Sequence, residues 1–224
     1  MRESKRKAVL FDMDGVIFDT ERLFTDCFLQ VSNADARRSR EEMERMLGEM
    51  RGRNARDCHR IALRYLHDID TYRRLTEKTD DLFRDVISTK GMPVKAGMAE
   101  LFAWLESRPI LTALVTSTNR DRVEEYFSHT DLPWIFDASV CGLEIGRGKP
   151  APGCYLTAAA KLGVRADQCL VLEDSLPGIQ AGVAAGAAVV MIPDLTPPDT
   201  YAYRNCQAIV QSGTDVIRML EGEN

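Results

Sequence analysis

The sequence lacks the features that mark several classes of protein. Its 224 residues contain no Cys-x-x-Cys pair, although cysteines stand at 27, 58, 141, 154, 169 and 206. The common zinc spacings are therefore absent, and cysteines inside apolar segments indicate small buried side chains in a reducing cytoplasm. No apolar run approaches the roughly 18 residues of a membrane span. The run Ala8–Phe11 after the basic start is too short for a signal peptide.

An excess of positive charge is also missing. The chain carries 29 Lys and Arg against 34 Asp and Glu, a formal net charge of −5, and it has no long basic block. Basic patches accompany nucleic-acid binding, so this balance argues against nucleic acid as a partner. With 45% hydrophobic and 28% charged residues, we expect a globular, cytoplasmic protein without a membrane partner.

Proline is absent from residues 20–90, and this stretch is rich in Arg, Glu, Asp, Leu and Met. Its apolar residues recur at helical spacing, as at Met43, Met46, Leu47 and Met50. The pattern predicts several helices and no strand.

The rest of the chain alternates between predicted strands and predicted helices. Strands are expected at Ala8–Asp12, Leu111–Thr116, Ala138–Cys141, Gln168–Glu173, Ala187–Ile192 and Ala208–Val210. Helices are expected at Met98–Leu105, Asp121–Phe127, Pro152–Leu162, Leu176–Ala185 and Thr214–Leu220. Alternation of this kind, with strands apolar on both faces, indicates an α/β fold with a doubly wound parallel sheet. We expect one core domain from residues 1–19 and 91–224, interrupted by an all-α domain at 20–90.

Polar residues follow the ends of the first four predicted strands. They are Asp12 and Asp14, then Thr116 and Ser117, then Lys149, and finally Glu173, Asp174 and Ser175. The carboxyl ends of parallel strands form one edge of the sheet, where ligands bind. Carboxylates crowded there repel one another, so a cation is expected among them, and oxygen ligands favour Mg²⁺.

Four segments around these residues resemble the motifs of the haloacid dehalogenase-like (HAD) superfamily. They are Phe11–Thr20, Val115–Ser117, Gly148–Pro152 and Leu172–Gly182, in the family's order and over residues 7–220. The fourth is distinctive of the branch that holds β-phosphoglucomutase and phosphoglycolate-phosphatase-like enzymes. The resemblance implies a Rossmann-like core with a helical cap inserted after the first strand.

The resemblance also implies roles for the polar residues. Asp12 would be the nucleophile that forms an aspartyl-phosphate, and Asp14 the general acid and base. Thr116 and Lys149 would contact the phosphoryl group. Asp12, the main-chain carbonyl of Asp14, Glu173 and Asp174 would be the metal ligands.

Three further core positions are expected to bind phosphate. Gly15 allows a tight turn that brings the backbone close to the anion, and Ser117 stands beside Thr116. Ser175 begins a predicted helix, so its N–H and hydroxyl could point toward an anion.

The predicted cap contains three close arginines, Arg51, Arg53 and Arg56, which could clamp a second anionic group of the substrate. The alternative is that they are solvated helix side chains. In alignment with the β-phosphoglucomutase cap, Ala55 occupies the place of an arginine that holds the distal phosphate. That departure disfavours the mutase.

These inferences lead to a Mg²⁺-dependent phosphatase of a small phosphorylated metabolite such as a sugar phosphate, a monomer or weak dimer. One alternative is a β-phosphoglucomutase-like phosphosugar mutase, which would share every core residue. Another is a non-catalytic metabolite-binding protein on the same fold. Asp14 argues against dehalogenase chemistry, because a halide leaving group needs no proton.

Overall fold

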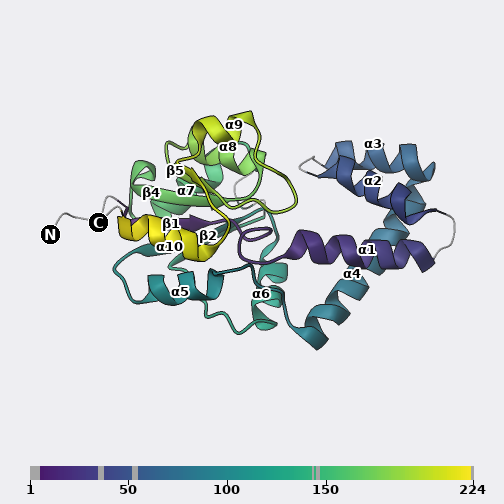
Figure 1. The fold of residues 1–224 in the computed structure, drawn as a ribbon, viewed down its shortest axis with the longest axis horizontal. Coiled ribbons are helices and arrows are strands. Elements are labelled where there is room, and N and C mark those ends of the chain that lie inside the picture. The colour runs from purple at the N-terminus through teal and green to yellow at the C-terminus, as the bar shows by residue number, and fades with distance from the viewer. Residues whose placement is uncertain (1–5, 35–37, 52–54, 143, 145–146, 223–224) are drawn as a thin grey trace. The chain divides into compact units, whose positions relative to one another are not determined.

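The computed structural model describes residues 6–34, 38–51, 55–142, 144 and 147–222 (Figure 1). The chain divides into two compact units. The sheet unit combines residues 1–19 with 92–224, and the helical unit is residues 20–91.

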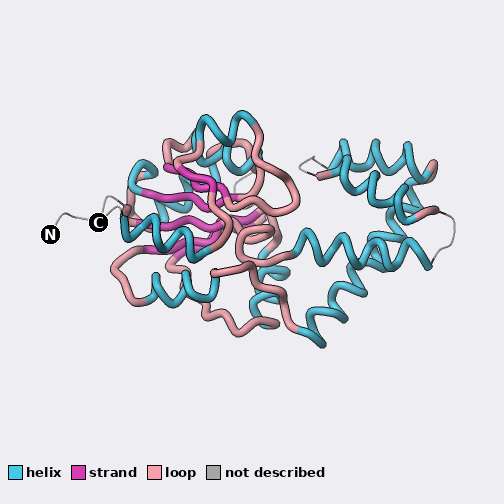
Figure 2. Tube along the Cα trace, viewed as in Figure 1, coloured by secondary structure: helices cyan, strands magenta, loops and turns pink. Residues whose placement is uncertain are grey.

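The sheet unit is built on six parallel strands in the order β3-β2-β1-β4-β5-β6, which lie side by side in Figure 2. The strands are β1 (Ala8–Phe11), β2 (Leu111–Thr116), β3 (Ala138–Cys141), β4 (Cys169–Glu173), β5 (Ala188–Met191) and β6 (Ala208–Ile209). The helices are α5 (Met98–Glu106), α6 (Arg120–Ser128), α7 (Gly153–Lys161), α8 (Leu176–Ala184), α9 (Thr200–Asn205) and α10 (Gly213–Gly222). This order confirms the predicted doubly wound α/β fold.

The central strands form because their apolar runs are buried on both faces. Every residue of β1 and β4 is buried. Alternate side chains point to opposite faces of a sheet. Leu10 packs with Tyr155 and Ala158 of α7, whereas the ring of Phe11 lies 5.5 Å from that of Phe102 in α5. Helices therefore cover both faces of β1.

The register of β1 with β2 and β4 aligns the carboxyl ends of these three strands. Phe11 is paired with Leu114 of β2 and with Leu172 of β4. The residues that follow these positions therefore reach the carboxyl edge together. Asp12 stays close to β4 there, because its N–H donates to the carbonyl of Leu172 at 3.0 Å.

The helical unit contains α1 (Thr20–Ala34), α2 (Arg40–Met50), α3 (Ala55–Leu66) and α4 (Ile69–Lys90), and no strand among its described residues. Ser39 caps α2 and Asp68 caps α4 through side-chain oxygens that accept backbone N–H groups. An apolar cluster holds the helices together; its largest members include Phe28, Met43, Met46, Leu47 and Leu75. The all-helical pattern expected from the sequence is confirmed for these residues.

Two elements were not predicted. Helix α9 falls in a segment without a predicted element, and the 3₁₀ turn Ala166–Gln168 ends on Gln168, which was predicted to begin the fourth strand. Asp199 caps α9 by accepting the N–H of Ala202 at 2.8 Å. A helix of six residues has little periodicity, so this cap was its main sequence signal.

All six cysteines are free thiols, and Cys27, Cys141, Cys154 and Cys169 are buried. Among the described residues, every helix is too short or too polar to cross a bilayer.

Candidate active site

Lys149 connects two acidic side chains at the carboxyl edge of the sheet. Its Nζ lies 2.6 Å from Asp12 Oδ1 and 2.6 Å from Glu173 Oε1, and it also donates to the carbonyl of Val115 at 3.2 Å. Asp12 follows β1, Glu173 ends β4, and Val115 belongs to β2. The three central strands are thus tied together by one ammonium group.

Burial and charge shape the ionisation of this cluster. Asp12 is 7% exposed, and burial, reinforced by Glu173 and Asp14, raises its pKa to about 7 despite the opposing charge of Lys149. Burial disfavours the Lys149 ammonium, yet Asp12 and Glu173 outweigh that effect and raise the pKa of Lys149. Lys149 therefore remains charged, and a further cation would favour the carboxylate form of Asp12.

Glu173 is completely buried and surrounded by donors. Its Oε1 accepts from Lys149 and, at 2.5 Å, from the hydroxyl of Tyr155. Its Oε2 accepts from the hydroxyl of Ser175 at 2.9 Å and from the Ser175 N–H at 3.4 Å. A buried carboxylate is costly unless it is paired and hydrogen-bonded, and here both oxygens have donors.

Asp14 lies two residues beyond Asp12 and faces two threonines. Its Oδ2 accepts from the Thr118 hydroxyl at 2.7 Å and lies 3.4 Å from the Thr116 hydroxyl. The turn is closed by the Gly15 N–H, which donates to the carbonyl of Phe18 at 2.9 Å. The β2 edge therefore orients the second acidic group of the first motif.

Gly15 is required by its surroundings as well as by its backbone. Its φ is +76°, and a Cβ there would stand 2.4 Å from Asp174 Oδ2. Only a glycine adopts this positive φ without strain and leaves room for the Asp174 carboxylate. The turn after β1 can therefore pass directly over Asp174.

Three of these carboxylates suit a metal ion. Oxygens of Asp12, Glu173 and Asp174 lie within 4.8 Å of one another. Lys149 offers one positive charge against these three groups, so the cluster retains negative charge when they are ionised. Hard carboxylate oxygens with an excess of negative charge fit Mg²⁺.

The two serines expected to bind phosphate lie in different surroundings. Ser117 is exposed after β2. Ser175 caps α8, where its Oγ accepts the Gly178 N–H at 3.3 Å, while its own N–H and hydroxyl donate to Glu173. The anion that Ser175 faces in this structure is therefore the Glu173 carboxylate.

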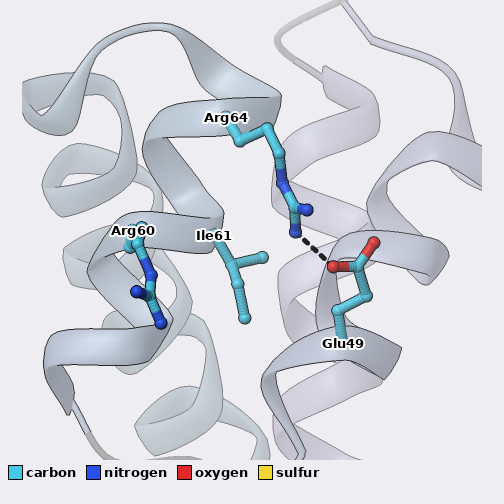
Figure 3. A pocket seen from close by; sticks show the side chains of 4 residues that line it. All are labelled: Glu49, Arg60, Ile61 and Arg64. Carbon is cyan, nitrogen blue, oxygen red and sulfur yellow. Dashed lines mark hydrogen bonds and ion pairs between the residues drawn. The ribbon is translucent and has the colours of Figure 1, made fainter.

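The arginines expected to clamp the substrate belong to the helical unit. Arg51 and Arg56 are exposed, and Arg53 lies outside the described residues. Nearby, Glu49, Arg60, Ile61 and Arg64 line a cavity of about 330 Å³. Figure 3 shows these four side chains. Arg64 is paired with Glu49, and Arg60 with Asp57 at 2.6 Å, so both cavity arginines already have carboxylate partners.

The sequence analysis missed Tyr155, Thr118 and Gly178. Gly178 lies in the first turn of α8, and a Cβ there would stand 1.8 Å from Glu173 Oε1. Thr118 follows the second motif by one residue, which was its only signal. Tyr155 carries a polar group on the apolar face of α7, a mismatch that could have marked it for a buried partner.

Comparisons with known proteins identify the family of the chain. The model of the haloacid dehalogenase-like hydrolase family matches residues 6–186. The chain is 29% identical over 181 residues to a phosphorylated carbohydrates phosphatase of Thermotoga maritima, covering 80% of this chain and 82% of that protein. It is also 29% identical over 187 residues to the fructose-1-phosphate phosphatase YqaB of Escherichia coli, covering 81% and 94%.

The fold has close counterparts among solved structures. A HAD family hydrolase from Deinococcus radiodurans, crystallised with phosphate and sodium, superposes with a TM-score of 0.80. The match covers 99% of this chain and 97% of that one at 22% identity, so it speaks for the fold alone. With a family model that spans most of its length, this chain belongs to the haloacid dehalogenase-like hydrolases.

Proposed function

We propose that the chain is a Mg²⁺-dependent phosphatase of small phosphorylated metabolites that works through an aspartyl-phosphate. The observation that carries this proposal is the buried Asp12 carboxylate held 2.6 Å from Lys149, with Asp14 two residues away and Asp174 beside it. A nucleophile, a proton donor and a charge-compensating group thus occur at one sheet edge.

The reaction divides into two displacements at phosphorus. An oxygen of Asp12 forms a bond to phosphorus while the ester P–O bond breaks, and Asp14 gives its proton to the departing alkoxide. In the second step Asp14 takes a proton from water, the water oxygen bonds to phosphorus, and the aspartyl P–O bond breaks. Phosphate leaves and both carboxyl groups return to their starting states.

The phosphoryl group carries charge that the site must compensate. Lys149 places an ammonium against Asp12, and Thr116 at the end of β2 carries a hydroxyl donor that faces Asp14 in this structure. Asp12, Glu173, Asp174 and the main-chain carbonyl of Asp14 would hold Mg²⁺. When bound, that ion supplies positive charge next to the transferring group.

The names of two relatives support a class of substrate. These relatives are named for phosphorylated carbohydrates and for fructose 1-phosphate. A sugar phosphate is therefore the first class to test, with the helical unit as the cap that supplies leaving-group contacts. Arg51, Arg53 and Arg56 are candidates for such contacts.

The test is turnover by the purified chain on an array of sugar phosphates and p-nitrophenyl phosphate with Mg²⁺. We expect release of inorganic phosphate that EDTA stops and that Asp12→Asn abolishes. Turnover no higher than in Asp12→Asn on every ester rejects the proposal. Conversion of β-glucose 1-phosphate to glucose 6-phosphate without net phosphate release would instead identify a mutase.

A further inference from the structure

Tyr155 is a buried polar residue that the proposed reaction does not use. It lies in α7 and has no exposed surface. Its hydroxyl donates at 2.5 Å to Glu173 Oε1, the same oxygen that accepts from Lys149 at 2.6 Å. The Tyr155 hydroxyl is thus hydrogen-bonded to the carboxylate that shares Lys149 with Asp12.

This sharing determines where the ammonium is held. Lys149 Nζ is shared at equal distances of 2.6 Å between Asp12 Oδ1 and Glu173 Oε1. A buried carboxylate that loses one donor attracts its remaining partners more strongly, because the low dielectric amplifies each interaction. Without the Tyr155 hydroxyl, Glu173 would draw Lys149 away from Asp12.

We propose that Tyr155 is a positioning residue whose hydroxyl satisfies Glu173 and so keeps Lys149 available to Asp12. For its effect on turnover, this inference rests on the proposed function of Asp12. The contact itself is a property of the fold. Residues that form hydrogen bonds to metal-binding or charged active-site groups often affect activity nearly as much as those groups themselves.

The variant that isolates the hydroxyl is Tyr155→Phe. It keeps the ring, over which Lys149 Nζ lies 5.3 Å from the centroid, and removes only the donor. The matched control is Tyr126→Phe, because Tyr126 is also buried and its hydroxyl accepts a hydrogen bond from Arg122 at 2.9 Å in α6. Both variants lose one hydrogen-bonded hydroxyl from the sheet unit.

Steady-state kinetics are measured at saturating Mg²⁺ on the best substrate of the wild-type chain. We expect Tyr155→Phe to lower kcat about 10- to 100-fold. We expect its KM to stay within about threefold, because the hydroxyl does not contact substrate. Tyr126→Phe should keep the wild-type kcat. A Tyr155→Phe kcat within about twofold of wild type, or an equal loss in Tyr126→Phe, overturns the proposal.

A double-mutant cycle with Glu173→Gln separates positioning from general loss of structure. If the hydroxyl acts through the charge of Glu173, then Tyr155→Phe should change kcat less than about threefold in the Glu173→Gln chain. The same cycle, measured on the free energy of unfolding in urea, should also be non-additive. Additive effects in either measurement would show that Tyr155 does not act through Glu173.

The unfolding cycle needs no turnover, so it remains decisive if no substrate is found. Absence of activity in the wild-type chain on all esters rejects the proposed function alone. Additive unfolding effects reject the role of Tyr155 alone.

Discussion

Gly178 makes room for the buried carboxylate of Glu173. A Cβ built on Gly178 would stand 1.8 Å from Glu173 Oε1 and 2.1 Å from Oε2, so any side chain there would displace the carboxylate. Gly178 lies inside α8 with an ordinary helical backbone, and its requirement is therefore one of space rather than of conformation.

Gly178→Ala is expected to lower kcat at least about 100-fold, because Glu173 must leave the position from which it holds Lys149. The crowding should also reduce the free energy of unfolding by about 1–3 kcal/mol. Phosphate release and urea unfolding measure the two effects.

The control is Gly48→Ala in α2, where nothing lies within 4 Å of the added Cβ. Alanine is the better helix former, so this variant should gain about 0.5–1 kcal/mol without losing activity. Equal behaviour of the two alanine variants would contradict the steric argument.

The pKa of Asp12 predicts how the metal-free chain responds to pH. This pKa rises from 3.8 for an ordinary aspartate to about 7 in the fold, mainly through burial. Between these values the folded chain binds a proton that the unfolded chain has released, so the contribution of Asp12 to stability falls as pH rises. Above the folded pKa the contribution becomes constant.

Asp12→Asn removes this titration. In EDTA, the free energy of unfolding of Asp12→Asn minus that of wild type should increase from about pH 5 to pH 7 and then level off. Urea unfolding of both chains across this range gives the difference. A difference that is the same at every pH would contradict the raised pKa.

Lys95 and Asp194 form a second ion pair in the sheet unit, with little exposed side-chain surface. Lys95 Nζ lies 2.6 Å from Asp194 Oδ1, and the two side chains are 15% and 0% exposed. Asp194→Asn should lower the free energy of unfolding by about 3 kcal/mol, because it leaves the lysine charge without its partner. Thermal or urea unfolding measures the loss.

The exposed pair Arg218–Asp215 is the comparison, with Arg218 76% exposed. Arg218→Ala should change stability little, since solvent screens such pairs. If Asp194→Asn and Arg218→Ala had equal free energies of unfolding, the low exposure of the Lys95–Asp194 pair would not increase its contribution to stability.

Asp174 provides the test of the metal site. Its oxygens lie within 4.8 Å of those of Asp12 and Glu173, so Asp174 is expected to contribute to metal binding. Asp174→Asn should weaken Mg²⁺ binding at least about 10-fold in calorimetry without substrate. Ser117→Ala, at an exposed position, should bind Mg²⁺ as wild type does. Unchanged affinity in Asp174→Asn would exclude Asp174 as a ligand.

Features of the fold that depend on short, local sequence patterns could be predicted best. The strands Leu111–Thr116 and Ala138–Cys141 have the predicted bounds, because each is a short and mostly apolar run. The groups at the strand ends could be proposed for the same reason, since parallel topology brings those ends to one edge.

The hydrogen bonds between the side chains at the strand ends depend on tertiary packing. They could therefore not be predicted from local sequence patterns. Tyr155 is 18 residues from Glu173 along the chain, and Thr118 is 104 residues from Asp14. No local pattern pairs residues at such separations. The donors on Ser175 illustrate the same limit, because a helix start predicts an anion but does not say that the anion is a side chain of the protein.

The position of β1 in the middle of the sheet has a consequence for how the molecule is made. Its neighbours β2 and β4 begin at residues 111 and 169, whereas the helical unit ends at residue 91. During synthesis from the N-terminus, the whole helical unit is therefore complete before β1 can gain its first strand partner. Asp12 can meet both Lys149 and Glu173 only after residue 173 has been made, so this charged cluster assembles later than the helical unit.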